Sequence, residues 1–267
     1  MTGVEVLIGL MTGMLVGASA IGSGSLVTPL LLLWTAVPAP VAIGTSLALA
    51  TGTKLSGYIA HRHLGHVDFK LGTWLLAGAI PGTIAAVFVL VPLKATLLPS
   101  DGGRQIVGLL LMVLAALLFW TPQRQAGSGG DAAVEEQAAP EPSRVIGKRG
   151  SLVGALVSFI VTLTSVGSGG LLMLALMLWQ PKSGRRYTPG SLVGTVTFYG
   201  LVVTVLGAGA HVALNHVDFV LLAGLLAGSV PGVLLGARFT RLIPERYYQK
   251  GIAGLNLALG LRLALIG

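Results

Sequence analysis

The sequence predicts an all-α polytopic membrane protein of about eight transmembrane helices in two internal repeats. The first observation is composition: 54% of the 267 residues are hydrophobic, only 10% are charged, and the mean hydropathy is +0.86. A soluble domain carries about a quarter charged residues. The second is the length of the apolar runs, which repeatedly reach the roughly 20 residues that a helix needs to cross a bilayer. The third is that motifs of the first half return in the second.

Eight apolar segments follow one another along the chain. They cover, approximately, residues 3–33, 34–60, 71–93, 105–121, 151–181, 187–210, 217–237 and 251–261. Because lipid offers no hydrogen-bond partner to the backbone, such segments must be helices or strands of a closed barrel. Continuous apolar runs lack the alternation of barrel strands, so we expect helices. The first and fifth segments are too long for one plain crossing.

Short motifs show that the two halves are copies of each other. At an offset of 150 residues, HVDF recurs at 66 and 216, LLAG at 75 and 225, PG at 81 and 231, and GT at 44 and 194. At an offset of 145, GSG recurs at 22 and 167 and tryptophan at 34 and 179. Apolar composition alone would give scattered leucine matches, so the pattern indicates a duplication. Helix count decides the relation of the copies: an even number per half makes them parallel, and an odd number inverts them.

A segment rich in glycine, alanine, proline and charge separates the copies, which is typical of a flexible linker. We therefore divide the chain into a first membrane repeat over residues 1–122, a linker over 123–149 and a second membrane repeat over 150–267. Internal duplication is the common construction of secondary transporters, whose substrate site lies near the membrane midplane between the repeats.

The first segment of each repeat carries Gly-Ser-Gly near its middle, and glycine weakens a helix by about 1 kcal/mol relative to alanine. We expect the first helix of each repeat to be broken there. A broken helix turns free N–H groups and the positive end of its dipole inward, which favours an anion. The hypothesis is that the substrate site is lined by Ser23, Gly24, Ser25, Ser168, Gly169 and Gly170. The alternative is that these small residues let helices pack closely.

Three further polar residues on apolar segments are candidates for the substrate site. Lys54 is the one basic residue well inside an apolar run, and an intramembrane charge is a functional hypothesis by default. Its stem could instead extend to the membrane interface, and the second repeat has Thr204 at the equivalent place. Thr45 and Thr195 either line a pore or bond back to their own helix carbonyls.

Histidine and aspartate gather at equivalent junctions between helices, namely His61, His66 and Asp68 and, in the second repeat, His211, His216 and Asp218. A metal site or a proton relay would need these groups to converge. The simpler interpretation is that each aspartate caps the helix that follows it. We therefore predict no metal site.

Several classes of protein are disfavoured. There are no cysteines, which excludes disulfides and thiol chemistry, and no GxxxxGK[ST] loop for nucleotides. The net charge of +8 comes from residues spread over short connections, which suits anionic lipid headgroups better than nucleic acid. No basic region precedes the first apolar run, so we expect no cleavable signal. We predict no catalytic residues and no cofactor.

The glycine-rich first segment with Gly22-Ser23-Gly24-Ser25 and Pro29, its repeat at Gly167-Ser168-Gly169-Gly170, and the His-x-Asp-Phe motif before a helix resemble the sulfite exporter TauE/SafE family. Ser25 departs from the usual glycine, which the second half keeps at Gly170. The resemblance covers both halves except the linker. It implies a multi-pass protein of the cell inner (cytoplasmic) membrane whose substrates are sulfite, sulfonates or other small organic anions.

The interpretation is a secondary anion transporter that works by alternating access, one repeat rocking against the other. Coupling to a proton or another ion and plain facilitation are both open. One alternative, from another functional class, is a membrane-embedded enzyme or assembly factor. A second alternative, also a transport protein, is a channel. If each of the eight segments crosses the membrane once, the connections on one side carry nine basic residues and those on the other side carry six. The side with nine is then favoured as cytoplasmic.

Overall fold

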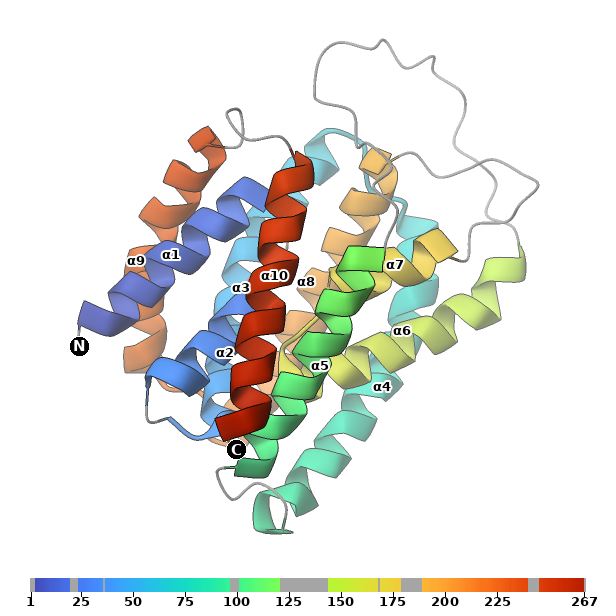
Figure 1. Ribbon diagram of the computed structural model, residues 1–267. Coiled ribbons are helices and arrows are strands. Elements are labelled where there is room, and N and C mark those ends of the chain that lie inside the picture. The colour runs from blue at the N-terminus through green and yellow to red at the C-terminus, as the bar shows by residue number, and fades with distance from the viewer. Residues whose placement is uncertain are drawn as a thin grey trace.

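The computed structural model describes residues 3–19, 24–35, 37–96, 101–120, 144–167, 169–178, 189–239 and 245–266. Every regular element in these ranges is an α-helix (Figure 1). The helices are α1 (Gly3–Ser19), α2 (Gly24–Trp34), α3 (Ala39–His63), α4 (Phe69–Thr96), α5 (Asp101–Trp120), α6 (Arg144–Thr164), α7 (Gly170–Leu178), α8 (Pro189–Ala213), α9 (Phe219–Phe239) and α10 (Glu245–Ile266). The all-α prediction is confirmed. Helix α6 begins at Arg144, inside the segment that the sequence assigns to the linker.

Some of the helices have the length and the apolar surface of membrane spans. Three of them contain continuous apolar stretches long enough to cross a bilayer, at Phe69–Leu90, Ser191–Ala213 and Phe219–Gly236. Shorter apolar stretches occupy Gly3–Val16, Gly150–Thr164 and Ala253–Leu265. Large apolar side chains such as Phe88, Leu234 and Leu265 are more than 60% exposed, as expected for helices that face lipid. The protein is therefore a polytopic membrane protein.

The first segment of each repeat is broken where the sequence predicts. Helix α1 ends at Ser19 and α2 begins at Gly24, while α6 ends at Thr164 and α7 begins at Gly170. At each break the chain reverses, so that α1 with α2 and α6 with α7 form helical hairpins (Figure 1). Each repeat therefore contributes five helices within the described residues.

Neighbouring residues across the helix pairs show that the repeats are inverted. In the α3–α8 pair, Gly44 lies next to His211 and Gly57 next to Thr197, so these equivalent helices run antiparallel. Helices α5 and α10 are also equivalent, and Gly108 lies near Ala264 while Met112 lies near Gly260, which makes them antiparallel as well. Because equivalent helices run in opposite directions, the pseudo-two-fold axis that relates the two repeats is roughly perpendicular to the helices. This agrees with the odd number of helices in each repeat.

The two repeats are interlocked through glycine contacts. Helix α1 of the first repeat packs along α9 of the second, and α6 of the second packs along α4 of the first. Gly9 and Gly228 bring the α1 and α9 backbones together, and Gly78 and Gly154 do the same for α4 and α6. A Cβ at any of these glycines would meet backbone atoms of the partner helix. Such close approach is typical of membrane helices, where van der Waals packing drives association.

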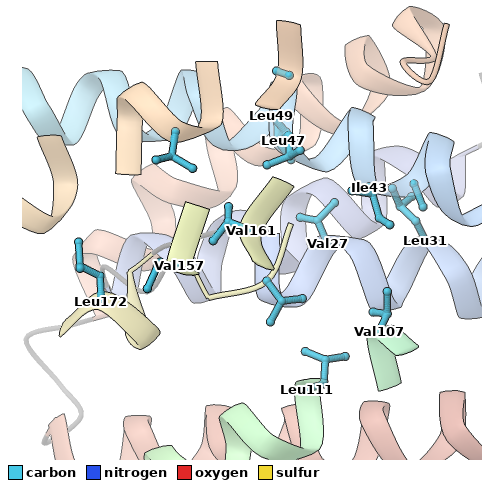
Figure 2. Packing of buried hydrophobic residues seen from close by; sticks show 14 of the residues in the cluster. Val27, Leu31, Ile43, Leu47, Leu49, Val107, Leu111, Val157, Val161 and Leu172 are labelled. Carbon is cyan, nitrogen blue, oxygen red and sulfur yellow. The ribbon is translucent and has the colours of Figure 1, made fainter. Parts of the chain in front are cut away.

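The centre of the molecule is apolar. Side chains from all ten described helices belong to one cluster, and Figure 2 labels members from α2, α3, α5, α6 and α7. Val27 of α2, Leu47 of α3, Leu111 of α5, Val161 of α6 and Leu172 of α7 are each completely buried. The half-helices α2 and α7 are thus anchored inside the bundle.

Basic residues gather at one face of the bundle. Helices α3 and α9 end there and α4, α6 and α10 begin there. In Figure 1, α9 ends and α10 begins at the top, and α6 begins at the right. In the described residues this face, called the basic face below, carries Arg62, Lys70, Arg144, Lys148, Arg149, Arg238, Arg246 and Lys250. The opposite face carries Lys94, Arg104 and Arg262. Because of the hairpins, some basic residues lie on the other side from the one that eight simple crossings would assign to them. The difference in the number of basic residues between the two faces becomes larger as a result.

Candidate functional site

The candidate site lies on the seam between α3 and α8, the equivalent helices that cross at the middle of the molecule. Small and polar residues form one stripe on each helix, and the two stripes face each other in antiparallel register. The register is set by four neighbouring pairs, which are Gly44 with His211, Leu47 with Gly207, Lys54 with Gly200, and Gly57 with Thr197.

Lys54 is the charged residue of this seam. Its side chain lies over Gly200, so that a Cβ built on Gly200 would be 2.8 Å from Nζ and 3.2 Å from Cε. The residue is only 8% exposed. Among the residues that the structure describes, Lys54 has no ion pair and no hydrogen bond to its ammonium group. A buried ammonium without a partner is costly.

The depth of Lys54 argues against the alternative in which its stem reaches the membrane interface. Helix α3 covers residues 39–63, so its midpoint is residue 51 and Lys54 lies three residues away (54 − 51). At 1.5 Å per residue, the end of the helix at His63 is roughly 14 Å further along the axis. A four-carbon stem cannot cover that distance. In the structure the side chain lies over Gly200, inside the seam.

The starts of the half-helices are the other part of the site that the sequence predicts. In the second repeat, Ser165 has a φ of 61° and Gly167 a φ of 93°. These left-handed conformations turn the chain between α6 and α7, and the one at Ser165 is strained for a residue with a side chain. The Ser165 hydroxyl oxygen is buried and makes no hydrogen bond within the described residues. Gly169 precedes the half-helix α7 and Gly170 is its first residue, so that the N-terminus of α7 follows this turn.

The corresponding part of the first repeat is described less fully. Gly24 and Ser25 are the first residues of α2, as the broken-helix hypothesis requires. Ser23 and Ser168 lie outside the described residues, and their predicted contact with substrate stays a prediction. The same holds for the side chain of Ser25.

Thr45 and Thr195 have hydrogen-bond partners in the opposite repeat. The Thr45 hydroxyl oxygen accepts the N–H of Asp218 at 3.1 Å, and the Thr195 hydroxyl oxygen accepts the N–H of Asp68 at 2.9 Å. The preceding glycines, Gly44 and Gly194, leave room for the carbonyl groups of His216 and His66. We call these two equivalent contacts the inter-repeat clamps. Each clamp joins the start of one seam helix to the HVDF junction of the other repeat.

The interpretation of Asp68 and Asp218 as helix caps is confirmed. Asp68 Oδ1 accepts the N–H groups of Lys70 and Leu71, each at 3.0 Å. Asp218 Oδ1 accepts those of the two residues at the same positions in α9, at 2.9 and 3.0 Å. These bonds satisfy backbone donors that every helix start leaves free.

The histidines lie in matching pairs at the ends of α3 and α8. The rings of His61 and His66 are 5.9 Å apart between centroids, and those of His211 and His216 are 5.4 Å apart. His211 Nε2 also lies 3.0 Å from the carbonyl oxygen of Thr162. In the described part of the chain, no group of three or more potential metal ligands comes together. The two histidine pairs lie beside the clamps, since the His216 and His66 carbonyl groups contact Gly44 and Gly194.

Sequence reasoning did not single out Gly200, which makes room for Lys54. The residue falls in none of the recurring motifs, and the second repeat has Gly200 where the first has Ala50 (200 − 150). The sequence did contain a signal for this position. One helical stripe of α8 has the same spacing as the stripe of α3 that contains Lys54, and it consists of Thr197, Gly200, Thr204 and Gly207. Only the antiparallel register shows that Gly200 faces that lysine.

Inverted repeats, broken first helices and a central buried charge define the class as polytopic membrane transporters. Within that class, residues 6–263 match the model of the family described as sulfite exporter TauE/SafE. The match covers nearly the whole chain, so the protein belongs to the TauE/SafE family. It is a membrane transporter and not an enzyme.

Two similar relatives come from Bacillus subtilis strain 168. The chain is 29% identical to the probable membrane transporter protein YjnA over 97% of its own length and 98% of that protein. It is 27% identical to the probable membrane transporter protein YdhB over 92% and 94% of the two lengths. No solved structure matches the chain significantly.

Proposed function

We propose that the protein moves small anions, namely sulfite, sulfonates or related organic anions, across the cytoplasmic membrane by alternating access. The observation that carries this proposal is Lys54, a buried cation without an acidic partner among the described residues, near the midpoint of the seam. A bound anion would neutralise its charge at that depth. The family description supports a sulfur-containing anion as substrate.

The half-helices α2 and α7 provide the rest of the proposed binding site. Their first residues, Gly24 with Ser25 and Gly170 after Gly169, would direct backbone N–H groups toward the anion, with Ser23 and Ser168 beside them. Such N-termini stabilise negative charge without a second buried cation. We assign Thr45 and Thr195 to the clamps rather than to the substrate, because their hydroxyl oxygens already accept backbone N–H groups.

The interlocking of the repeats argues against a mechanism in which one whole repeat rocks against the other. Such a motion would separate α1 from α9 and α4 from α6, where backbones meet through glycine. Helices α5 and α10 pack on each other outside those interfaces, and α10 also contacts α2. We propose that α5 and α10 move relative to the rest of the bundle, while the contacts of α1 with α9 and of α4 with α6 are kept.

The proposed orientation places the basic face in the cytoplasm. Transmembrane proteins keep an excess of lysine and arginine near helix ends on that side. The described helices carry eight basic residues at the basic face and three at the other. Anionic lipid headgroups would be the partners of this face.

Flux into proteoliposomes tests the function. We expect saturable uptake of radiolabelled sulfite or sulfoacetate that is stimulated by the same anion on the opposite side, which a channel would not show. Taurine and unrelated carboxylates measure selectivity. Lys54→Met should reduce the flux at least about tenfold, the equivalent of 1.4 kcal/mol. Lys70→Met, a change at an exposed lysine, is the matched control. Undiminished flux in Lys54→Met would contradict the proposal.

A further inference from the structure

The seam contains one position where the two repeats differ in charge, and the residue opposite it differs as well. Lys54 on α3 corresponds to Thr204 on α8, and Gly200 opposite Lys54 corresponds to Ala50. The antiparallel register that pairs Leu47 with Gly207 and Lys54 with Gly200 places Ala50 opposite Thr204. The lysine thus lies opposite a glycine, whereas its smaller counterpart lies opposite an alanine.

Gly200 differs in its surroundings from the glycines that bring helix backbones together. At Gly44, Gly78 and Gly194, a Cβ would meet backbone carbonyl oxygens of the other repeat. At Gly200 the three nearest atoms are Nζ, Cε and Cδ of Lys54, at 2.8, 3.2 and 3.4 Å. A methyl group there would move the flexible end of the lysine rather than the helices. The missing side chain at 200 therefore decides where the ammonium group lies.

We propose that Gly200 is the positioning residue for the Lys54 ammonium in the anion site. We also propose that Ala50 and Thr204 form the equivalent pair with the repeats exchanged, in which Thr204 takes the place of Lys54, Ala50 takes the place of Gly200, and neither residue is charged. This pair is called the reversed seat below. This inference rests on the proposed function, because it assigns Lys54 to substrate. It adds that the position of the cation is determined by a glycine on the other repeat.

The matched pair Gly200→Ala and Gly209→Ala tests the role of Gly200. Both glycines lie on α8, and a Cβ at Gly209 meets no atom within 4 Å. Gly200→Ala should raise the KM for the transported anion about tenfold and change the maximal rate less, because the ammonium group is displaced but kept. Its thermal unfolding should stay close to that of the wild type. Gly209→Ala should leave KM unchanged.

A transplanted lysine tests the reversed seat. Lys54→Thr should abolish saturable anion flux. Adding Thr204→Lys together with Ala50→Gly should restore part of it, whereas Thr204→Lys without Ala50→Gly should restore less. A packing role for Gly200 alone predicts no such dependence on residue 50.

The outcomes separate the two proposals. If the wild type shows saturable anion flux and Lys54→Met loses it, but Gly200→Ala has the KM of Gly209→Ala, the role of Gly200 is overturned and the function stands. Equal flux in the two transplanted variants overturns the reversed seat. If the wild type shows neither anion flux nor an anion-induced shift in its melting temperature, both the function and the role of Gly200 fall.

Discussion

The two repeats share their architecture but not their chemistry. Both contain a helical hairpin, an inter-repeat clamp, a capping aspartate and glycine-lined contacts with the other repeat. At the centre of the seam, however, the first repeat has Lys54 where the second has Thr204. The clamps and the glycine contacts join the inverted halves, because each repeat supplies one side of these contacts. Lys54 occurs in one repeat only and takes part in neither the clamps nor the caps.

The largest effect is expected where the repeats interlock. Gly78→Ala in α4 and Gly228→Ala in α9 are equivalent changes, and each would place a methyl group against a backbone carbonyl of the neighbouring helix. Because neither backbone can move cheaply, each variant should lose about 3 kcal/mol of unfolding free energy. Thermal unfolding in detergent, followed by tryptophan fluorescence, measures the loss.

Gly209→Ala is the control for this comparison, since it adds the same methyl group in open space and should not destabilise the protein. A loss in Gly78→Ala without a loss in Gly228→Ala would show that the two repeats are not held by equivalent contacts.

A smaller effect is expected at the clamps. Thr45→Val and Thr195→Val keep the shape of the side chain but leave the N–H of Asp218 or Asp68 without its acceptor. Each change should cost about 1–2 kcal/mol of unfolding free energy, and the double variant should lose the sum because the clamps lie at opposite ends of the seam. The KM for the transported anion should not change in either variant. A raised KM with unchanged stability would return these threonines to the substrate site.

The smallest effect is expected at the helix caps. Asp68→Ala and Asp218→Ala each remove a carboxylate that accepts two backbone N–H groups. Each should cost about 1 kcal/mol, seen as a small fall in the unfolding temperature. Asp68→Asn and Asp218→Asn keep a capping oxygen and should lose less. Equal losses for alanine and asparagine would mean that the charge, not the cap, stabilises these junctions.

Local features of the fold could be predicted from the sequence. Long apolar runs determine that the chain forms membrane helices, because lipid forces each backbone group to find a partner within its own segment. The recurrence of HVDF and Gly-Ser-Gly indicated the duplication. The positions of Gly-Ser-Gly also predicted where the first helix of each repeat breaks. The capping role of Asp68 and Asp218 also followed from their position before apolar helices.

Only the tertiary structure decided how the repeats meet. The reversal of the chain at each break makes five helices per repeat, and this inverts the halves and collects the basic residues at one face. A hairpin and a broken crossing have the same local sequence, so no periodicity distinguishes them. The roles of Thr45 and Gly200 depend on residues more than a hundred positions away. Antiparallel packing of α3 against α8 brings these residues together. Contacts across the two helices set the register, so neither helix alone predicts it.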